Sequence, residues 1–192
     1  MHQWTESSER LERFRWLEAR RLPSPCFVVD EEALEENLRL LKRVQQESGA
    51  KILLALKAFA MWSFAPLVAR YLAGTCASGA HEARLGREHF GGEVHTYSAA
   101  YREPDLREVL KMSDHVVFNT PAQWLRFKSL SIQETRTRPH LKFGLRVNPE
   151  HSEGAAALYD ACAPFSRLGT PRAAIQAGDL DGLTGLHFHT LC

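Results

Sequence analysis

The hydrophobic residues of this chain alternate between a spacing typical of helices and a spacing typical of strands. Leucines and a valine recur at helical intervals between Asp30, which suits an N-cap, and Gly49, which can end a helix. Short apolar runs and amphipathic stretches then alternate along the rest of the sequence. Six core strands are predicted near residues 53, 75, 95, 117, 145 and 187, and a short first strand is predicted in PCFVVD.

The segments between these strands carry helix signals. Thr120-Pro121 and Thr170-Pro171 each pair an N-cap residue with a proline that fits the first helical turn. A charged amphipathic helix is expected up to about Arg21, so the chain divides into an N-terminal helical extension, 1–22, and a β/α domain, 23–192. Further helices are predicted over about 62–72, 81–90, 103–112, 121–130 and 170–178.

Strands that alternate with helices form parallel β-α-β units. Two α/β architectures fit this order, namely an open doubly wound sheet and a (β/α)8 TIM-type barrel. A complete barrel needs about 250 residues, whereas this chain has 192, so about six units would make a partial barrel. The residue pattern alone leaves both architectures open.

Polar residues gather where the predicted strands end. Period-two alternation puts His187 and His189 on one face of the last strand, and it puts Arg146 on the polar face of another. Lys57 and Asn119 also fall near strand ends. Because active sites of parallel α/β folds lie at the carboxyl ends of the strands, we expect these residues to converge there.

Lys57 is the one polar residue in the apolar stretch ILLALKAFA. A buried lysine is costly unless it is paired or chemically used. Desolvation lowers the pKa of a lysine and leaves a free amine that can form a Schiff base. The alternative is a lysine at a strand end whose side chain reaches solvent.

The other candidate residues each have two interpretations. Arg146 could hold an anion or a cofactor oxygen, or it could form an interior salt bridge with Glu82. His187 and His189 could share a zinc ion, but no third ligand is evident, so one functional histidine with a packed neighbour is the favoured interpretation. Ser78 starts a turn that either connects a strand to a helix or lets a ligand approach the backbone.

Composition narrows the range of partners. The chain has 24 lysines and arginines against 23 acidic residues, so neither nucleic acid nor an anionic membrane is indicated. Its N-terminus is too charged for a secretory signal, and no apolar run is long enough to span a bilayer. The four cysteines form no CxxC pair, so we expect reduced thiols in a cytoplasmic protein.

Six motifs in order give the sequence a specific resemblance. PCFVVDEEAL, ALKAF, CASGAHE, LRVNP, SRLG and GLHFHT resemble segments of the fold-type III, alanine racemase-like decarboxylases that depend on pyridoxal phosphate. Within that group, stretches such as LALKAFA, EVHTYSAAYRE and VVFNTPAQW are similar to the carboxynorspermidine/carboxyspermidine decarboxylase family. The resemblance covers residues from about 23 to 192 and implies a TIM-type barrel.

This resemblance implies a cofactor and a reaction. Lys57 would bind pyridoxal 5'-phosphate covalently, and His189 would stack on its ring, so both residues are expected to be catalytic. The substrate would be a small carboxy-polyamine, which loses carbon dioxide to give norspermidine or spermidine. The family also implies a homodimer and no catalytic metal.

The remaining site residues follow from the same resemblance. Arg146 would lie near the ring substituents of the cofactor, and Ser78 and Glu82 would line its pocket. Ser166 and Arg167 match a segment close to the active site and are expected to contact the substrate.

The chain also departs from the family. A complete member is about twice as long, with two more barrel units, a glycine-rich phosphate loop and a C-terminal β-domain with which PCFVVD normally pairs. We therefore expect a truncated form with impaired activity. The alternatives are a non-catalytic or regulatory homologue that binds pyridoxal phosphate and, less favoured, a metal hydrolase that uses His187 and His189.

Overall fold

The computed structural model describes residues 14, 17, 21–153 and 159–190 and contains one parallel sheet of seven strands. Six of the strands follow one another across the sheet in chain order, and β7 also pairs with β5. β5 therefore pairs with β7 through residues 144–146 and with β6 through residues 147–148. The strands are β1 Leu53–Ala55, β2 Gly74–Ala77, β3 Glu93–Tyr97, β4 His115–Phe118, β5 Lys142–Asn148, β6 Thr170–Pro171 and β7 Gly185–His187.

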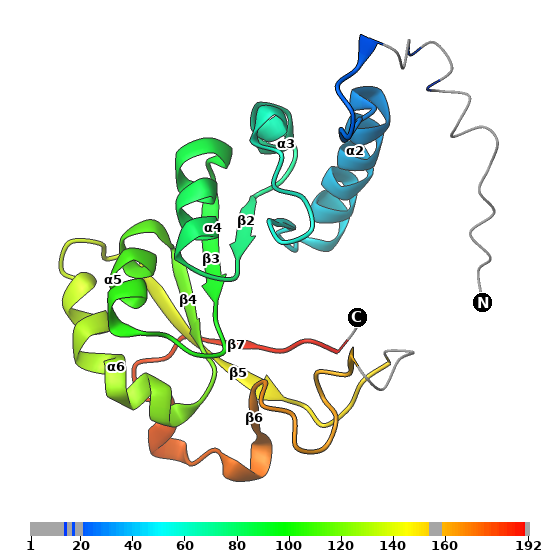
Figure 1. Ribbon diagram of the computed structural model, residues 1–192. Helices are drawn as coiled ribbons and strands as arrows, with labels where there is room; N and C mark the ends of the chain where they lie inside the picture. The colour runs from blue at the N-terminus through cyan, green and yellow to red at the C-terminus, as the bar shows by residue number, and fades with distance from the viewer. Residues whose placement is uncertain (1–13, 15–16, 18–20, 154–158, 191–192) are drawn as a thin grey trace.

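This strand order decides between the two architectures that the sequence left open. A doubly wound sheet reverses its strand order at a switch point, whereas β1 to β6 follow one another without a reversal. Figure 1 shows α4, α5 and α6 along one side of the curved sheet, as the outer helices of a barrel would lie. The fold is α/β, and the prediction of a partial barrel is confirmed.

The helices lie largely where the sequence predicted them. Thr120 caps α6, because its side-chain oxygen accepts a hydrogen bond from the Gln123 N–H at 3.1 Å. Asp30 caps α2 in the same way, and Gly49 ends that helix with φ of +74°. The bounds are α2 Glu31–Ser48, η2 Trp62–Phe64, α3 Ala65–Ala69, α4 Ala80–Leu85, η3 Gly86–Phe90, α5 Glu103–Met112, α6 Pro121–Glu134, η5 Arg172–Ala174 and η6 Ala177–Leu180.

Two predicted elements are wrong. PCFVVD forms no strand, and Phe27 within it is 95% exposed. A strand needs a neighbouring strand for its backbone hydrogen bonds, and none of the described residues provides one. TPRAAIQAG forms β6 and two short 3₁₀ turns in place of a helix, because Thr170-Pro171 pairs with the end of β5. Nearly all of the predicted N-terminal helix lies outside the described residues.

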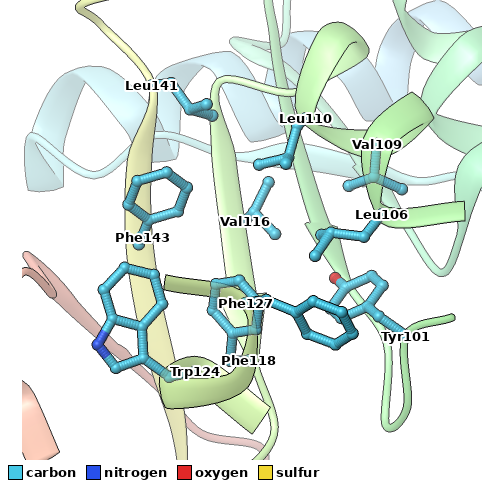
Figure 2. Packing of buried hydrophobic residues seen from close by; sticks show 10 residues of the cluster. All are labelled: Tyr101, Leu106, Val109, Leu110, Val116, Phe118, Trp124, Phe127, Leu141 and Phe143. Atoms are coloured by element: carbon cyan, nitrogen blue, oxygen red, sulfur yellow. The ribbon is translucent and has the colours of Figure 1, made fainter. Parts of the chain in front are cut away.

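The largest hydrophobic cluster fixes the outer helices to the sheet. Phe118 and Phe143 point outward from β4 and β5, and the Trp124 ring from α6 packs against both with centroids 5.2 Å away (Figure 2). The Trp124 indole N–H donates to the Asp181 carbonyl at 3.0 Å, so its one polar atom is satisfied. This packing leaves the opposite, inner face of the strands for polar side chains.

Among the described residues, no helix is long and apolar enough to cross a membrane. Cys26, Cys76 and Cys162 are all free thiols, so none of these three forms a disulfide with another.

Candidate active site at the carboxyl ends of the strands

A cavity of about 680 Å³ opens along the inner face of the sheet and the carboxyl ends of its strands. Strands β1 to β5 and β7 all contribute to it, so residues distant in sequence converge as the strand pattern predicted. Among the described residues that line it, six side chains can carry a positive charge and none is a carboxylate. These six residues are Lys57, His95, His115, Arg146, His187 and His189.

Lys57 lines this cavity, but its environment differs from the prediction. β1 ends at Ala55, and Lys57 lies in the turn that follows, where its side chain is exposed. Of the two interpretations of Lys57, the structure therefore agrees with a lysine at a strand end whose side chain reaches solvent. The physical reason is that β1 pairs only with β2 among the described residues, so this edge of the cavity is open to solvent. Lys57 and His189 both line the cavity, and the positive charge of Lys57 adds to the causes that lower the pKa of His189.

Arg146 is 5% exposed and packs against an aromatic ring rather than a carboxylate. Its guanidinium carbon lies 4.6 Å from the centroid of Tyr97, a cation–π contact. Glu82 instead accepts a hydrogen bond from the Ser78 N–H at 2.7 Å, at the start of α4, so the interior salt bridge considered for Arg146 does not form. The Arg146 charge therefore faces the cavity without a counter-charge from the described carboxylates.

Asn119, at the end of β4, joins three segments of the site. Its Oδ1 accepts hydrogen bonds from the Tyr97 hydroxyl at 2.8 Å and from the Gly169 N–H at 2.7 Å. Its Nδ2 donates to the Arg167 carbonyl at 2.9 Å. Asn119 is 6% exposed, so these bonds are shielded from water. The amide therefore holds both the Tyr97 ring under Arg146 and the segment from Arg167 to Gly169 beside β4.

His187 and His189 both line the cavity, as the alternation of the last strand predicted. Burial is the main cause that lowers the pKa of His187, to about 4, and the Arg146 charge adds to it. Burial also lowers the pKa of His189. The His187 Nδ1 is buried without a hydrogen-bond partner. Within the described residues, neither histidine belongs to a group of three metal-ligating side chains, so the structure gives no support to a zinc site here.

The pKa of His187 predicts acid sensitivity. The unfolded chain binds a proton at this residue below about pH 6.5, but the folded chain does so only below about pH 4. The free energy of unfolding should therefore fall as the pH drops through that window. Protonation of His187 should lower the free energy of unfolding by about 1–2 kcal/mol across this window. The difference between the two pKa values corresponds to a maximum of about 3 kcal/mol, and the partial exposure of the side chain reduces it. Urea unfolding of His187→Gln at several pH values should show a weaker pH dependence, whereas the exposed His81→Gln should match the wild type.

The remaining predicted residues lie around the cavity. Ser78 lines it at the end of β2, whereas Glu82 lies in the first turn of α4 and is not among its lining residues. Leu168 lines the cavity directly, and the half-buried Ser166 and the exposed Arg167 precede it in the chain. The Ser166 hydroxyl accepts a hydrogen bond from the Leu168 N–H at 3.2 Å. The SRLG segment is therefore beside the cavity.

Several residues of the inner face were missed in the sequence. Tyr97, His95 and Glu93 alternate with the buried Val94 and Thr96 along β3, which is the same period-two signal that identified Arg146. Applying that alternation to EVHTY would have placed all three on the inner face. The contact of Tyr97 with Arg146, by contrast, needs the spatial proximity of β3 and β5, which no local pattern reveals.

The side chains present fit an anionic, aldehyde-bearing cofactor such as pyridoxal phosphate. The positive charges of Lys57 and Arg146, with no carboxylate among the described lining residues, attract a phosphorylated ligand. The unpaired and buried Nδ1 of His187 leaves one polar atom that a bound molecule could satisfy. Lys57 supplies a primary amine at the accessible edge of the same cavity.

Sequence comparison finds curated relatives for most of this chain. It is 44% identical over 172 residues to a carboxyaminopropylagmatine decarboxylase of Synechocystis sp.. It is 38% identical over 172 residues to a carboxynorspermidine/carboxyspermidine decarboxylase of Campylobacter jejuni. These matches cover 89% and 90% of this chain but only 43% of each relative, so the chain spans less than half the length of the curated relatives it matches. No family model matches the chain.

A solved structure agrees with these relatives. The carboxynorspermidine decarboxylase from Campylobacter jejuni, crystallised in complex with norspermidine, superposes with a TM-score of 0.75 at 36% identity. The superposition covers 89% of this chain and 42% of that enzyme. A lysine decarboxylase from Selenomonas ruminantium superposes with a TM-score of 0.63 at 19% identity, which shows a shared fold.

Proposed function

This chain is homologous to the N-terminal part of the carboxynorspermidine/carboxyspermidine decarboxylases, and on that premise we propose that it forms the cofactor-binding barrel portion of a carboxy-lyase that makes polyamines. The observation that carries the proposal is the convergence of Lys57, Arg146, His187 and His189 on one cavity whose described lining includes no carboxylate. The cofactor would be pyridoxal phosphate. When bound, it would supply the aldehyde that captures an amine and the ring that accepts electrons as carbon dioxide leaves.

Lys57 would hold the cofactor, and its exposed position suits that role. Its amine reaches the cavity from the turn after β1, where an incoming substrate amine can also approach. His189 would cover one face of the cofactor ring from the end of β7. Burial and the nearby charges of Arg146 and Lys57 lower the pKa of this imidazole, so it stays neutral at pH 7 and can pack against an aromatic ring without a desolvated charge.

Arg146 and Ser78 would orient the cofactor. The Arg146 guanidinium is held in place by the Tyr97 ring, so its donors remain directed into the cavity at little further cost in side-chain entropy. Ser78 lies at the end of β2 and can offer its hydroxyl to an anionic group. Glu82 stabilises this turn by accepting a hydrogen bond from the Ser78 N–H. It would therefore position Ser78 through the backbone and would not contact the cofactor.

The positive charges of Lys57 and Arg146, both on the lining of the cavity, also have a consequence for the substrate. A carboxy-polyamine carries a carboxylate at one end and ammonium groups along its tail. The lining charges attract the carboxylate and repel the ammonium groups, so the tail should extend away from the cavity. Ser166 and Arg167, at the rim, would contact the carboxylate end.

The family would act as a homodimer in the cytoplasm.

The proposal is tested by assaying this chain with excess pyridoxal phosphate and three substrates: carboxynorspermidine, carboxyspermidine and carboxyaminopropylagmatine. We expect slow release of carbon dioxide from at least one of them, together with the corresponding decarboxylated amine. Capture of the cofactor without any release would instead favour the non-catalytic homologue. Release that persists without pyridoxal phosphate would contradict the proposed chemistry.

A further inference from the structure

A second group of chemically active side chains lies deeper on the inner face, toward the amino ends of β3 and β4. His95 and His115 occupy paired positions on these neighbouring strands. Their rings stack with centroids 4.0 Å apart and planes inclined by 22°. Glu93 lies two residues before His95 on the same face of β3, and its Oε2 is 3.0 Å from the His95 Nε2. None of these three residues has a role in the proposed decarboxylation.

From this arrangement we propose that Glu93, His95 and His115 form a binding site for a divalent transition metal such as zinc. One ligand atom from each residue lies within 4.8 Å of the other two. Two imidazoles and one carboxylate form a ligand set that zinc accepts, with a water molecule at the fourth position. Among the described residues, no other group of three potential ligands comes this close.

All three side chains are half-buried, which limits competition by water without closing the site.

The geometry shows what binding requires. Ligand atoms around a tetrahedral zinc lie about 3.3–3.5 Å apart, so these side chains must rotate to bring their lone pairs together. The stacked rings must tilt, since parallel imidazoles direct their lone pairs side by side. Strands β3 and β4 are fixed by their register, so only side-chain torsions need to change.

Lys51 opposes the metal. Its ammonium group forms a salt bridge with the Glu93 Oε1, and it therefore competes with a cation for this carboxylate. Removing the ammonium should strengthen metal binding. Tighter metal binding by a Lys51 variant could not result from a damaged fold, because misfolding would weaken binding.

The test is a titration of the purified chain with cobalt(II), whose visible absorption reports tetrahedral coordination, and with zinc as competitor. We expect His95→Asn and His115→Asn each to weaken binding by tenfold or more, and Lys51→Met to tighten it several-fold. His81→Asn, which changes an exposed histidine outside the group, should match the wild type. Far-UV circular dichroism checks that each variant is folded.

Three results would overturn the proposal: no cobalt binding to the wild type, unchanged binding in the His95 and His115 variants, or weaker binding in Lys51→Met. Loss of binding in His187→Asn alone would also overturn it, because the metal would then bind near the carboxyl ends of the strands rather than at Glu93, His95 and His115. The proposal does not depend on decarboxylase activity, since Lys57→Ala should bind cobalt as the wild type does.

Discussion

Replacing Lys57 by alanine is expected to abolish covalent capture of pyridoxal phosphate and to reduce decarboxylation on the order of 10³-fold or more. The reason is chemical, because a primary amine must reach the aldehyde of the cofactor, and Lys57 is the only lysine among the described residues that line the cavity. The measurement is reduction with borohydride after incubation with pyridoxal phosphate, followed by mass spectrometry of the labelled peptide.

Two further variants make the result specific. Lys57→Arg keeps the positive charge but lacks a primary amine, so it should also fail to capture the cofactor. Lys111→Ala removes an exposed lysine on α5, where it pairs with Glu108, and should leave capture unchanged. If Lys57→Ala were labelled as efficiently as Lys111→Ala, exposed lysines would account for the labelling and the assignment of Lys57 would be wrong.

The position of Lys57 illustrates what its local sequence could and could not predict. The alternation in ILLALKAFA correctly placed Ala55 and Lys57 on the face that now lines the cavity. The same apolar run suggested burial, yet Lys57 is exposed because β1 stops two residues earlier and forms an edge of the sheet. Whether a strand has one neighbour or two depends on segments elsewhere, so the sequence of that strand cannot decide it.

The fold likewise has parts that local sequence predicts and parts that depend on distant segments. Each of the six predicted core strands is present, because their apolar runs are short and are separated by clear helix signals such as Thr120-Pro121. Local chemistry alone misled at Thr170-Pro171, where the same signal leads into a strand. The difference arises from β5, whose last residues, Val147 and Asn148, accept Thr170-Pro171 as a partner. Tertiary pairing thus overrides a local helix signal.

Asn119 is the site residue whose importance depends most on long-range contacts. The sequence placed it at a strand end, but its partners Tyr97, Arg167 and Gly169 lie 22 to 50 positions away in the chain. A single buried amide with both acceptor and donor capacity meets the needs of all three. Few other side chains could do so at this position, because aspartate lacks the donor and leucine lacks both.

Asn119→Ala is accordingly expected to lower the free energy of unfolding by about 2–5 kcal/mol. The substitution leaves the buried Gly169 N–H without its acceptor and removes the bonds to the Tyr97 hydroxyl and the Arg167 carbonyl. Urea denaturation followed by circular dichroism measures the change. Asn37→Ala, at an exposed position of α2, is the matched control and should change stability by no more than about 0.5 kcal/mol.

The same variant separates stability from the organisation of the site. Without Asn119, Tyr97 loses the acceptor that orients its ring under Arg146, and the segment from Arg167 to Gly169 loses its tie to β4. Cofactor capture by Lys57 should therefore weaken even at urea concentrations where the variant is fully folded. Unchanged capture in a folded Asn119→Ala would show that Arg146 and the SRLG segment are positioned without this amide, and the network would then serve stability alone.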